Sequence, residues 1–460
     1  MTHAELEDRL SVDMREVVRQ LYQDHLDLRS EHEERLEVVN AEGSLHGAVE
    51  PGHSRPLATV FGEVTVRRLA YRHRGEENLY PADAALALPE EIYSHGLRRF
   101  AAEESSRGSF DETVAAIERS SGQHVPKRQV EELTRAAAVD FEAYYEQAKA
   151  AEATPGDVLV ISADGKGVAM RPDALRPATA KAAASKKLLG HLSKPERPYK
   201  KRMAELGAVY DVSPVPRCPE DIMATAKVPA PVARAKWLTA SVTDDIAEVI
   251  KTLFDETDRR DPGHRRTWVA LVDGARHQIS CIKAEAKARD VNVTIVVDFI
   301  HVLEYIWGAA RCFFPGDSAG AEAWVKDKAT EVMRSKASVV AGAVRRKATC
   351  LGLEPGARAD ADACADYLVA KAPYLDYANA LQKGWPIATG VIEGACRYLV
   401  ADRLGITGAR WGLEGAEAVL KLRALRSNGD FSSYWAYHLA QEKRRVHQSR
   451  YANGAIPRAA

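Results

Sequence analysis

Apolar and polar residues alternate along the chain with two different periods, and these periods predict its secondary structure. Residues 1–40 carry apolar side chains at helical spacing and predict one amphipathic helix. The Gly-, His- and Pro-rich stretch "EGSLHGAVEPGHSRP" is typical of a loop, and the next stretch, "TVFGEVTVRRLAYRH", predicts a short strand pair. Residues 94–147 return to helical spacing.

Within this second helical region, "GSFDETVAAIERSSGQHVPKRQVEELTR" predicts two helices joined by a tight turn. Ser109 is a suitable N-cap, residues 120–122 form a Ser-Ser-Gly turn, and Pro126 stands near the start of a helix that carries Lys127 and Arg128. This is the pattern of a DNA-binding helix-turn-helix. An ordinary helical hairpin has the same pattern, so both interpretations stay open at this point.

Residues 151–298 change to strands that alternate with helices, which predicts an α/β sheet covered by helices. The expected elements, in chain order, are a strand-turn-strand at 157–170, a strand at 206–215, a helix at 241–257, a strand at 267–275, a helix at 276–289 and a strand at 291–302. Beyond residue 302 the spacing is helical again. A later helix begins near Gly390, and the basic tail from Gln441 onward is expected to be frayed.

Composition narrows the functional classes. The chain of 460 residues is 46% hydrophobic and 28% charged, as in ordinary globular proteins, and its net charge of −1 gives no global attraction for nucleic acid. Six cysteines without a CxxC pair favour free thiols in a reducing compartment. No apolar run approaches the ~20 residues that span a bilayer, so we expect a cytoplasmic protein without a membrane partner.

One segment departs from this neutral balance. Residues 171–202 contain ten lysines and arginines against Asp173 and Glu196. A flexible basic segment suits contact with a phosphate backbone, but for the segment alone a solvated insertion is the favoured interpretation. Its candidate DNA contacts are Lys186, Lys187, Lys200, Lys201 and Arg202.

Three acidic residues stand where strands end or a helix begins. Asp164 in "ISADGKG" and Asp273 in "ALVDGAR" follow apolar strands, and Glu393 in "GVIEGACR" lies one turn into a helix. Each has an ordinary explanation, because Asp-Gly is a common turn and an acid favours the first turn of a helix. Together they match two-metal phosphoryl transfer, which needs carboxylates around two cations ~3.5–4 Å apart. Asp164 and Asp273 become neighbours if their strands pair side by side.

The ordered set of motifs resembles a known family. "ISADGKG", "KKRMAELGAVYDV", "ALVDGARH", "VVDFIHVLEYIW" and "GVIEGACRYLVADRLGITGARW" resemble the ribonuclease-H-like core of DDE transposases, in particular bacterial insertion-sequence transposases of the ISKra group, which are similar to the Mutator type. Asp298 and His301 resemble the Asp-x-x-His signature of Mutator-like enzymes. The resemblance extends from "FGEVTVRRLAY" to about Trp435, and the helical stretch before Glu393 is similar to the all-helical insertion of those enzymes.

This resemblance implies a fold, an activity and a set of site residues. The fold is an α/β ribonuclease-H-like core interrupted by an all-helical insertion, with an N-terminal helical, helix-turn-helix DNA-binding region. Asp164, Asp273 and Glu393, the last preferred to Glu414 and Glu417, are implied to hold two Mg²⁺ (or Mn²⁺) ions. Asp298 and His301 are implied to shape the site or to contact the cut DNA, and ordering of the following helix is an equal alternative for them.

The expected DNA contacts come from several segments. Trp411 either stacks on an unpaired base or, as favoured here, anchors its own segment by packing. The full set of expected contacts is Lys127, Arg128, Lys166, Lys186, Lys187, Lys200, Lys201, Arg202, Arg403, Arg410 and Trp411. The expected partners are double-stranded DNA, as element terminal repeats and target, and a second copy or more of the chain. The expected location is cytoplasmic and nucleoid-associated.

The predicted domain organisation and the alternative functions complete the expectation. The regions are an N-terminal helix and possible oligomer contact at 1–50, a β segment at 51–93, the helix-turn-helix-like region at 94–150, the first part of the core at 151–300, the helical insertion at 301–386, the core completion with the third acid at 387–440 and a basic tail at 441–460. Besides a transposase, a structure-selective nuclease on the same core and a catalytically silent, transposase-derived DNA-binding regulator remain alternatives.

Overall fold

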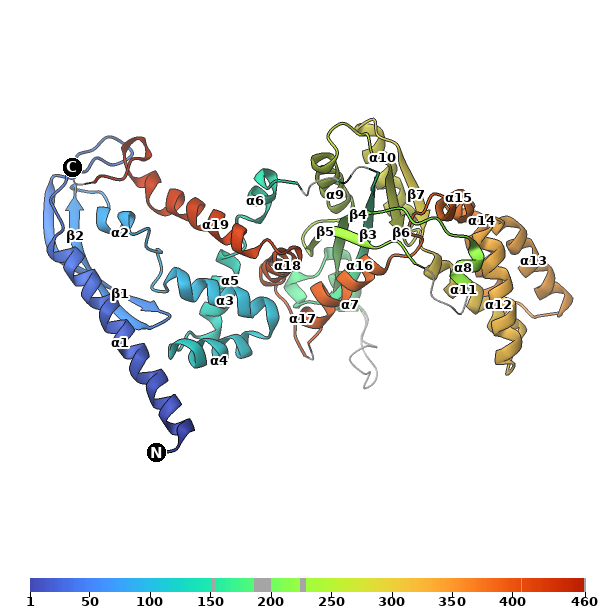
Figure 1. Ribbon diagram of the computed structural model, residues 1–460, viewed down its shortest axis with the longest axis horizontal. Helices are drawn as coiled ribbons and strands as arrows, with labels where there is room; N and C mark the ends of the chain where they lie inside the picture. The colour runs from blue at the N-terminus through green and yellow to red at the C-terminus, as the bar shows by residue number, and fades with distance from the viewer. Residues whose placement is uncertain (151–153, 155, 186–199, 224–228, 407, 459–460) are drawn as a thin grey trace. The chain divides into compact units, whose positions relative to one another are not determined.

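The computed structural model describes residues 1–150, 154, 156–185, 200–223, 229–406 and 408–458. These residues form two compact units (Figure 1). One unit contains residues 1–148 together with 414–460, and the other contains residues 149–413. The sequence-predicted acids at 164, 273, 298 and 393 all belong to the second unit.

The first unit combines a β-hairpin with helices from both ends of the chain. Its elements are α1 (His3–Glu31), β1 (Ala48–Thr59), β2 (Gly62–Arg72), α2 (Pro81–Ala85), α3 (His95–Arg107), α4 (Phe110–Ser121), α5 (Lys127–Ala136), α6 (Phe141–Gln147), α18 (Leu413–Asn428) and α19 (Phe431–Val446). The hairpin is longer than predicted, because residues 48–56, expected as loop, pair with β2. A register shift between Glu50 and His53 accommodates Pro51 and Gly52, which hid this strand in the sequence.

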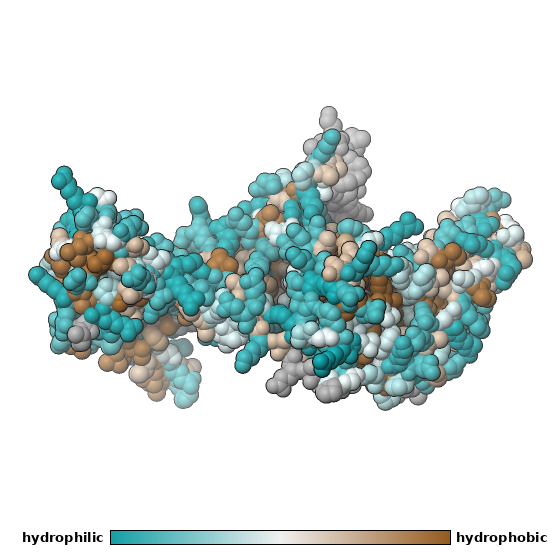
Figure 2. Space-filling view, turned by 90° about the horizontal axis from the view of Figure 1, so that it is seen from above, coloured by the Kyte–Doolittle hydropathy of each residue, from teal (hydrophilic) through white to brown (hydrophobic). Residues whose placement is uncertain are grey.

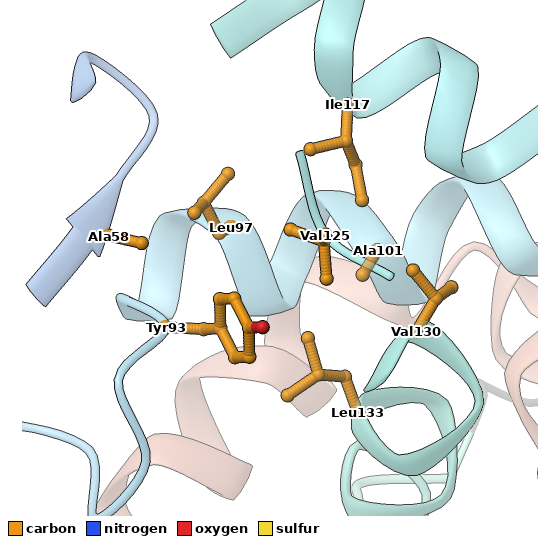
Figure 3. Close-up of a cluster of buried hydrophobic side chains, with 8 residues drawn as sticks. All are labelled: Ala58, Tyr93, Leu97, Ala101, Ile117, Val125, Val130 and Leu133. Carbon is orange, nitrogen blue, oxygen red and sulfur yellow. The ribbon is translucent and has the colours of Figure 1, made fainter. Parts of the chain in front are cut away.

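Helices α3, α4 and α5 share a small hydrophobic core with the end of the hairpin. Ser109 caps α4 as predicted, in a capping box with Glu112, and Gly122 ends this helix at φ 68°, a conformation that glycine adopts without strain. Figure 3 shows the buried side chains between the helices. They are Ala58, Tyr93, Leu97, Ala101, Ile117, Val125, Val130 and Leu133.

The C-terminal tail is ordered, so the prediction of a frayed tail was wrong. Glu442, near the end of α19, is buried and pairs with the buried Arg98 of α3. Tyr451 is buried and forms a β-bridge with Asn40. Some of the charged residues that suggested a solvated tail therefore form buried ion pairs within this unit.

The second unit is built around a five-stranded mixed sheet. The strands are β3 (Val158–Ala169), β4 (Lys201–Val212), β5 (Ala233–Ser241), β6 (Trp268–Val272) and β7 (Val293–Val297), and their order in the sheet is β5-β4-β3-β6-β7. β4 pairs antiparallel with both β3 and β5, whereas β3, β6 and β7 run parallel. The α/β class predicted from the sequence is confirmed.

Two strand predictions needed correction. The expected strand-turn-strand at 157–170 is one continuous strand, because β4 pairs with β3 along its whole length and passes Asp164 and Gly165 without a turn. β5 was missed, because it is a polar edge strand that contains Arg234 and Lys236 and a strained Ala235 at φ 46°.

The other regular elements of the second unit are helices, including all of those that follow β7. They are α7 (Pro177–Ser185), α8 (Pro219–Met223), α9 (Ile246–Arg260), α10 (Arg276–Ala288), α11 (Phe299–Phe313), α12 (Ser318–Met333), α13 (Ala337–Cys350), α14 (Ala359–Lys371), α15 (Tyr377–Gln382), α16 (Gly390–Ala395) and α17 (Asp402–Leu404). A π-helical segment, Cys396–Ala401, connects α16 to α17. None of the helices that the structure describes combines the length and the apolar character needed to cross a membrane.

Candidate active site

Three aspartates lie near one another at the level where β6 and β7 end and β3 continues beside β4. Ile161 of β3 pairs with Ala270 of β6 in the last pair of that ladder, and Asp164 and Asp273 each follow three residues later and line the same cavity. Val272 pairs with Val297 of β7, so the next residues, Asp273 and Asp298, are opposite each other. The predicted proximity of Asp164 and Asp273 therefore accompanies the side-by-side pairing of β3 and β6.

These aspartates line one cavity together with side chains from two helices. The cavity has a volume of about 230 Å³. Asp164, Asp273, Asp298, His301 and Glu393, the five residues that sequence analysis assigned to the chemistry, all contribute to its wall. The other lining residues are Ala163, Ile300, Glu304, Thr389 and Ile392.

Asp298 is buried, and protein donors occupy both of its carboxylate oxygens. Its Oδ1 accepts a hydrogen bond from the backbone N–H of Ile300 at 2.9 Å, which makes Asp298 the N-cap of α11. Its Oδ2 accepts a hydrogen bond of 2.6 Å from the hydroxyl of Thr389. These contacts favour the interpretation in which Asp298 orders the helix after β7.

Asp164 lies at the point where β6 ends and β3 continues with β4 as its neighbour. Its Oδ1 accepts from the backbone N–H of Gly165 at 2.7 Å, and its Oδ2 accepts from the thiol of Cys396, with a sulfur–oxygen distance of 3.2 Å. Burial, together with the negative charge of Asp164, raises the pKa of the Cys396 thiol. The thiol therefore stays protonated at neutral pH and remains a donor.

Asp273 follows β6 directly and is partly exposed. Its Oδ1 accepts from the backbone N–H of Ala275 at 2.9 Å, and its carbonyl oxygen accepts from the hydroxyl of Tyr367 at 3.0 Å. Gly274 has a φ of 94°, and a Cβ there would lie 3.1 Å from the Tyr367 hydroxyl oxygen. Both the conformation and the space require glycine after this aspartate.

Glu393 reaches the cavity from α16 and is exposed. The segment before α16 is fixed to the end of β7, because the backbone N–H of Phe299 donates to the carbonyl of Ile387 at 2.8 Å. Thr389 lies one turn before Glu393, and its hydroxyl oxygen is 3.5 Å from Glu393 Oε1. The alternative acids Glu414 and Glu417 belong to the other compact unit, where Glu414 pairs with Arg135 at 2.9 Å.

His301 stands on the first turn of α11 with its ring held by aromatic neighbours. The ring contacts Tyr305 and Tyr367 edge-on, and these two tyrosines stack with centroids 4.0 Å apart. His301 Nδ1 lies 3.3 Å from Glu304 Oε2. The imidazole is thus oriented at the wall of the cavity, where it is the single basic side chain among the described lining residues.

Four acids of the cavity, Asp164, Asp273, Asp298 and Glu393, form no ion pair with a basic side chain among the described residues. Within the described ranges, no lysine or arginine lines the cavity. Like charges gathered in one cavity repel each other, and a bound cation removes that repulsion. The donor set of carboxylate oxygens is the kind that Mg²⁺ and Mn²⁺ prefer.

The present orientation of the side chains differs from that of a loaded metal site. Among the residues that the structure describes, no group of three His, Cys, Asp or Glu side chains is arranged to hold a metal ion. Oxygens of Asp164 and Asp273 accept from neighbouring backbone N–H groups instead.

The expected DNA contacts of the second unit differ in their availability. Lys166, Lys201 and Arg410 are exposed and Lys200 is half-buried. Arg202, by contrast, donates to the backbone carbonyls of Val242, Ala174 and Thr243, and it has a structural role. Lys186 and Lys187 lie outside the described residues.

Arg403 and Trp411 are packed together inside the second unit. Arg403 is 2% exposed, and its guanidinium lies over the Trp411 ring at 4.8 Å from the centroid. The indole N–H of Trp411 donates to the carbonyl of Leu404 at 3.1 Å. Burial withdraws both side chains from DNA, so the expected phosphate contact of Arg403 does not fit, and the anchor interpretation of Trp411 is favoured.

Lys127 and Arg128 lie at the start of α5 in the first unit. Lys127 pairs with Asp111 of α4 at 2.8 Å, and Arg128 pairs with Glu132 at 3.2 Å while its side chain stays 88% exposed. Exposed ion pairs of this kind are weak, so both cations are able to exchange their partners for phosphate.

Two polar residues of the cavity wall, Thr389 and Glu304, escaped the sequence analysis, as did Cys396, whose thiol hydrogen bonds to Asp164 beside it. Thr389 and Cys396 precede and follow Glu393 by one helical turn, and Glu304 follows His301 at the same spacing. This i, i+3 and i, i+4 spacing, which puts side chains on one face of a helix, was the available signal.

No family model matches the chain, and no curated protein matches its sequence. The function is therefore argued from the site itself.

Proposed function

We propose that this protein is a DNA transposase of the DDE type, which binds the ends of its insertion sequence and catalyses phosphodiester cleavage and strand transfer. One observation carries the proposal. Five residues from four separate motifs, Asp164, Asp273, Asp298, His301 and Glu393, line a single cavity. Unrelated surface turns have no reason to converge in this way.

The architecture around the cavity supports a ribonuclease-H-like core. The mixed sheet holds the aspartates on adjacent parallel strands, which is the rigid support that a site for charge stabilisation needs. The chain between β7 and α16 is helical throughout its regular elements, as expected for an all-helical insertion. Glu393 then returns to the cavity after this insertion.

Asp164, Asp273 and Glu393 are the residues that would hold two Mg²⁺ or Mn²⁺ ions. Bound there, such ions stabilise the charge that develops on the attacking and leaving oxygens of an in-line displacement. Asp298 and Thr389 orient the helices that carry His301 and Glu393, because their hydrogen bond of 2.6 Å joins the start of α11 to the start of α16. His301, fixed by its tyrosine neighbours, is placed to contact the phosphate or the leaving oxygen.

DNA binding is assigned to exposed cations on both units. The helices α4 and α5, with the exposed Arg128 at the start of the second helix, support a helix-turn-helix that reads the terminal repeats. Lys166 and Arg410, exposed on the second unit, are suited to contact the phosphate backbone. Because element ends come in pairs, a dimer or larger assembly on DNA is part of the proposal.

Cleavage of the element's own ends tests this proposal. Full-length protein is incubated with duplexes that carry the ends flanking its gene, with Mg²⁺ or Mn²⁺, and nicking and strand transfer are measured. The variants are Asp164→Asn, Asp273→Asn and Glu393→Gln, and Glu414→Gln is the matched control because Glu414 belongs to the other unit. Metal-dependent cutting and joining, lost in the three variants and kept in the control, is the expected result.

Other outcomes separate the alternatives. Cutting without joining would favour a structure-selective nuclease on the same core. Tight binding of the ends without cleavage by the wild-type protein would favour a silent regulator and would remove the catalytic assignment.

A further inference from the structure

Helix α1 carries a stripe of exposed apolar side chains on the face turned away from its own unit. The stripe consists of Leu6, Leu10, Met14, Val17, Leu21 and Leu28. Their side chains are 40 to 63% exposed. Steps of three, four and seven residues, at about 100° per residue, keep all six within a sector of about 80°.

The opposite face of the same helix is already used. Leu26 is buried against the hairpin, Gln23 hydrogen bonds to the backbone of Thr65, and Arg67 of β2 pairs with Asp27. The stripe is thus a second apolar face, separate from the one that attaches α1 to its unit.

The N-terminal half of α1 has no tertiary support of its own. Every residue from 1 to 14 is exposed, although the capping box of Thr2 and Glu5 and the ion pair of Arg9 with Asp13 favour the helix locally. A helical segment of this length is marginal in water unless a neighbour buries part of its surface. Figure 2 shows hydrophobic side chains at the left of the view, the side on which Figure 1 draws α1.

Charge and spacing decide which occupant fits this stripe. Helix α1 contains eight acidic residues against four arginines, so it repels DNA and anionic lipid surfaces. Apolar residues that repeat every three and four positions fit another helix with the same repeat, whose side chains fill the gaps between them. Because each copy of this chain presents that repeat, the geometry points to a second copy of the chain as the occupant.

We propose that the apolar stripe of α1 pairs with the stripe of a second copy and forms a two-helix dimer contact. From Leu6 to Leu28 the stripe is about 33 Å long at 1.5 Å per residue. With a width of about 10 Å on each helix, the contact buries on the order of 700 Å² in total, which is at the weak end of protein interfaces.

A weak contact of this kind suits a protein that assembles on DNA. Two copies bound to paired DNA ends raise each other's local concentration, and a weak helix contact then becomes effective. The contact itself does not rest on the proposed chemistry, because it involves neither the cavity nor DNA.

The oligomeric state of the full chain in the absence of DNA tests this inference. Sedimentation equilibrium is measured over a range of protein and NaCl concentrations for the wild-type protein, for the double variant Leu10→Glu/Val17→Glu and for Val12→Glu. Val12 is the matched control, since it is 62% exposed but lies off the stripe. All three positions are exposed, so the substitutions leave the folded unit intact, and circular dichroism checks this.

The expected result is a concentration-dependent dimer of the wild-type protein and of Val12→Glu. Leu10→Glu/Val17→Glu should weaken the dimer at least tenfold. Added NaCl should strengthen the wild-type dimer, because salt screens the repulsion between two acidic helices. A wild-type protein that stays monomeric at every concentration, or an equal loss of dimer in the Val12→Glu control, would overturn the inference. A wild-type protein that forms the dimer but does not cleave DNA would count against the proposed function and leave this inference intact.

Discussion

The two ends of the central sheet differ in how their acidic side chains are paired. At the end where β3 and β6 begin, Asp211 lies between Arg260 and Arg266, and Asp157 pairs with Arg234. Arg260 also pairs with Glu256 of its own helix, at 2.6 Å. Arginine forks of this kind satisfy carboxylates in a low-dielectric setting.

At the other end, Asp164, Asp273, Asp298 and Glu393 surround a cavity without any such partner among the described residues. Arginines thus form ion pairs with the acids at one end of the sheet, whereas the described residues of the cavity include no arginine. The described acids at the cavity end contribute hydrogen bonds, such as those of Asp298 to Ile300 and Thr389, but no ion pair with an arginine. Their charge is available to a ligand that brings its own positive charge.

The largest effect is expected for Asp273→Asn at the cavity, which should lower DNA cleavage without lowering the melting temperature. Asp273→Asn removes a carboxylate that forms no ion pair with any described residue, so DNA cleavage should fall on the order of 10³-fold or more, which corresponds to about 4 kcal/mol of transition-state stabilisation. The melting temperature should stay the same or rise, because repulsion within the cavity decreases. A large fall in melting temperature would mean that Asp273 is structural.

The same substitution at the ion-paired end should have the opposite result. Asp211→Asn leaves Arg260, which is 6% exposed, with one partner fewer in a buried position. Breaking a buried pair costs about 3–5 kcal/mol of folding free energy. Unfolding in urea, followed by circular dichroism, should show this loss, while cleavage per folded molecule stays near the wild-type value. Loss of cleavage without loss of stability would erase the contrast between the two ends.

A smaller effect is expected where a hydroxyl orients the acids. Thr389→Val removes the donor to the buried Asp298 Oδ2 while it keeps the shape of the side chain. An unsatisfied buried acceptor costs about 1–3 kcal/mol, so stability and cleavage should both decrease moderately. Thr389→Ser restores the hydroxyl and should recover most of both. If the serine variant behaves like valine, the hydrogen bond is not the cause.

The smallest effect is expected at Cys396. Its thiol is a weak donor to Asp164. Cys396→Ala should reduce cleavage by about tenfold or less, since hydrogen bonds to charged groups contribute about 1.5–3 kcal/mol and a thiol donor lies below that range. Cys396→Ser keeps a donor and should remain closer to the wild-type rate. The Mg²⁺ dependence of the rate distinguishes two causes of a slower Cys396→Ala variant. A misoriented Asp164 raises the Mg²⁺ concentration needed for half-maximal rate, whereas a merely structural change leaves it unaltered.

Local sequence signals predicted those parts of the molecule that depend on local geometry. The N-cap at Ser109 and the glycine turn at Gly122 are set by neighbouring residues, and both are found as predicted. The proximity of Asp164 and Asp273 was expected only if their two strands paired side by side, and β3 and β6 do pair.

Long-range pairing explains what was not predicted. Nothing near Asp164 indicates that β4 holds the chain extended through an Asp-Gly pair that usually turns. The polar residues of β5 are typical of an edge strand, but its pairing with β4 could not be predicted from the sequence. In the sequence, Arg202 cannot be told apart from its basic neighbours. In the fold, its guanidinium donates to the carbonyls of Val242 and Thr243, so it is not a free surface cation.

Direct measurement of Mn²⁺ binding tests the central claim, namely that the uncompensated acids at the cavity form a divalent cation site. Electron paramagnetic resonance of free Mn²⁺ is titrated with the full-length protein, with Asp164→Asn, with Asp273→Asn and with the Glu414→Gln control. The account predicts saturable binding that excess Mg²⁺ displaces, that both aspartate variants lose and that the control retains. Equal Mn²⁺ binding by the wild-type protein and the two aspartate variants would contradict it.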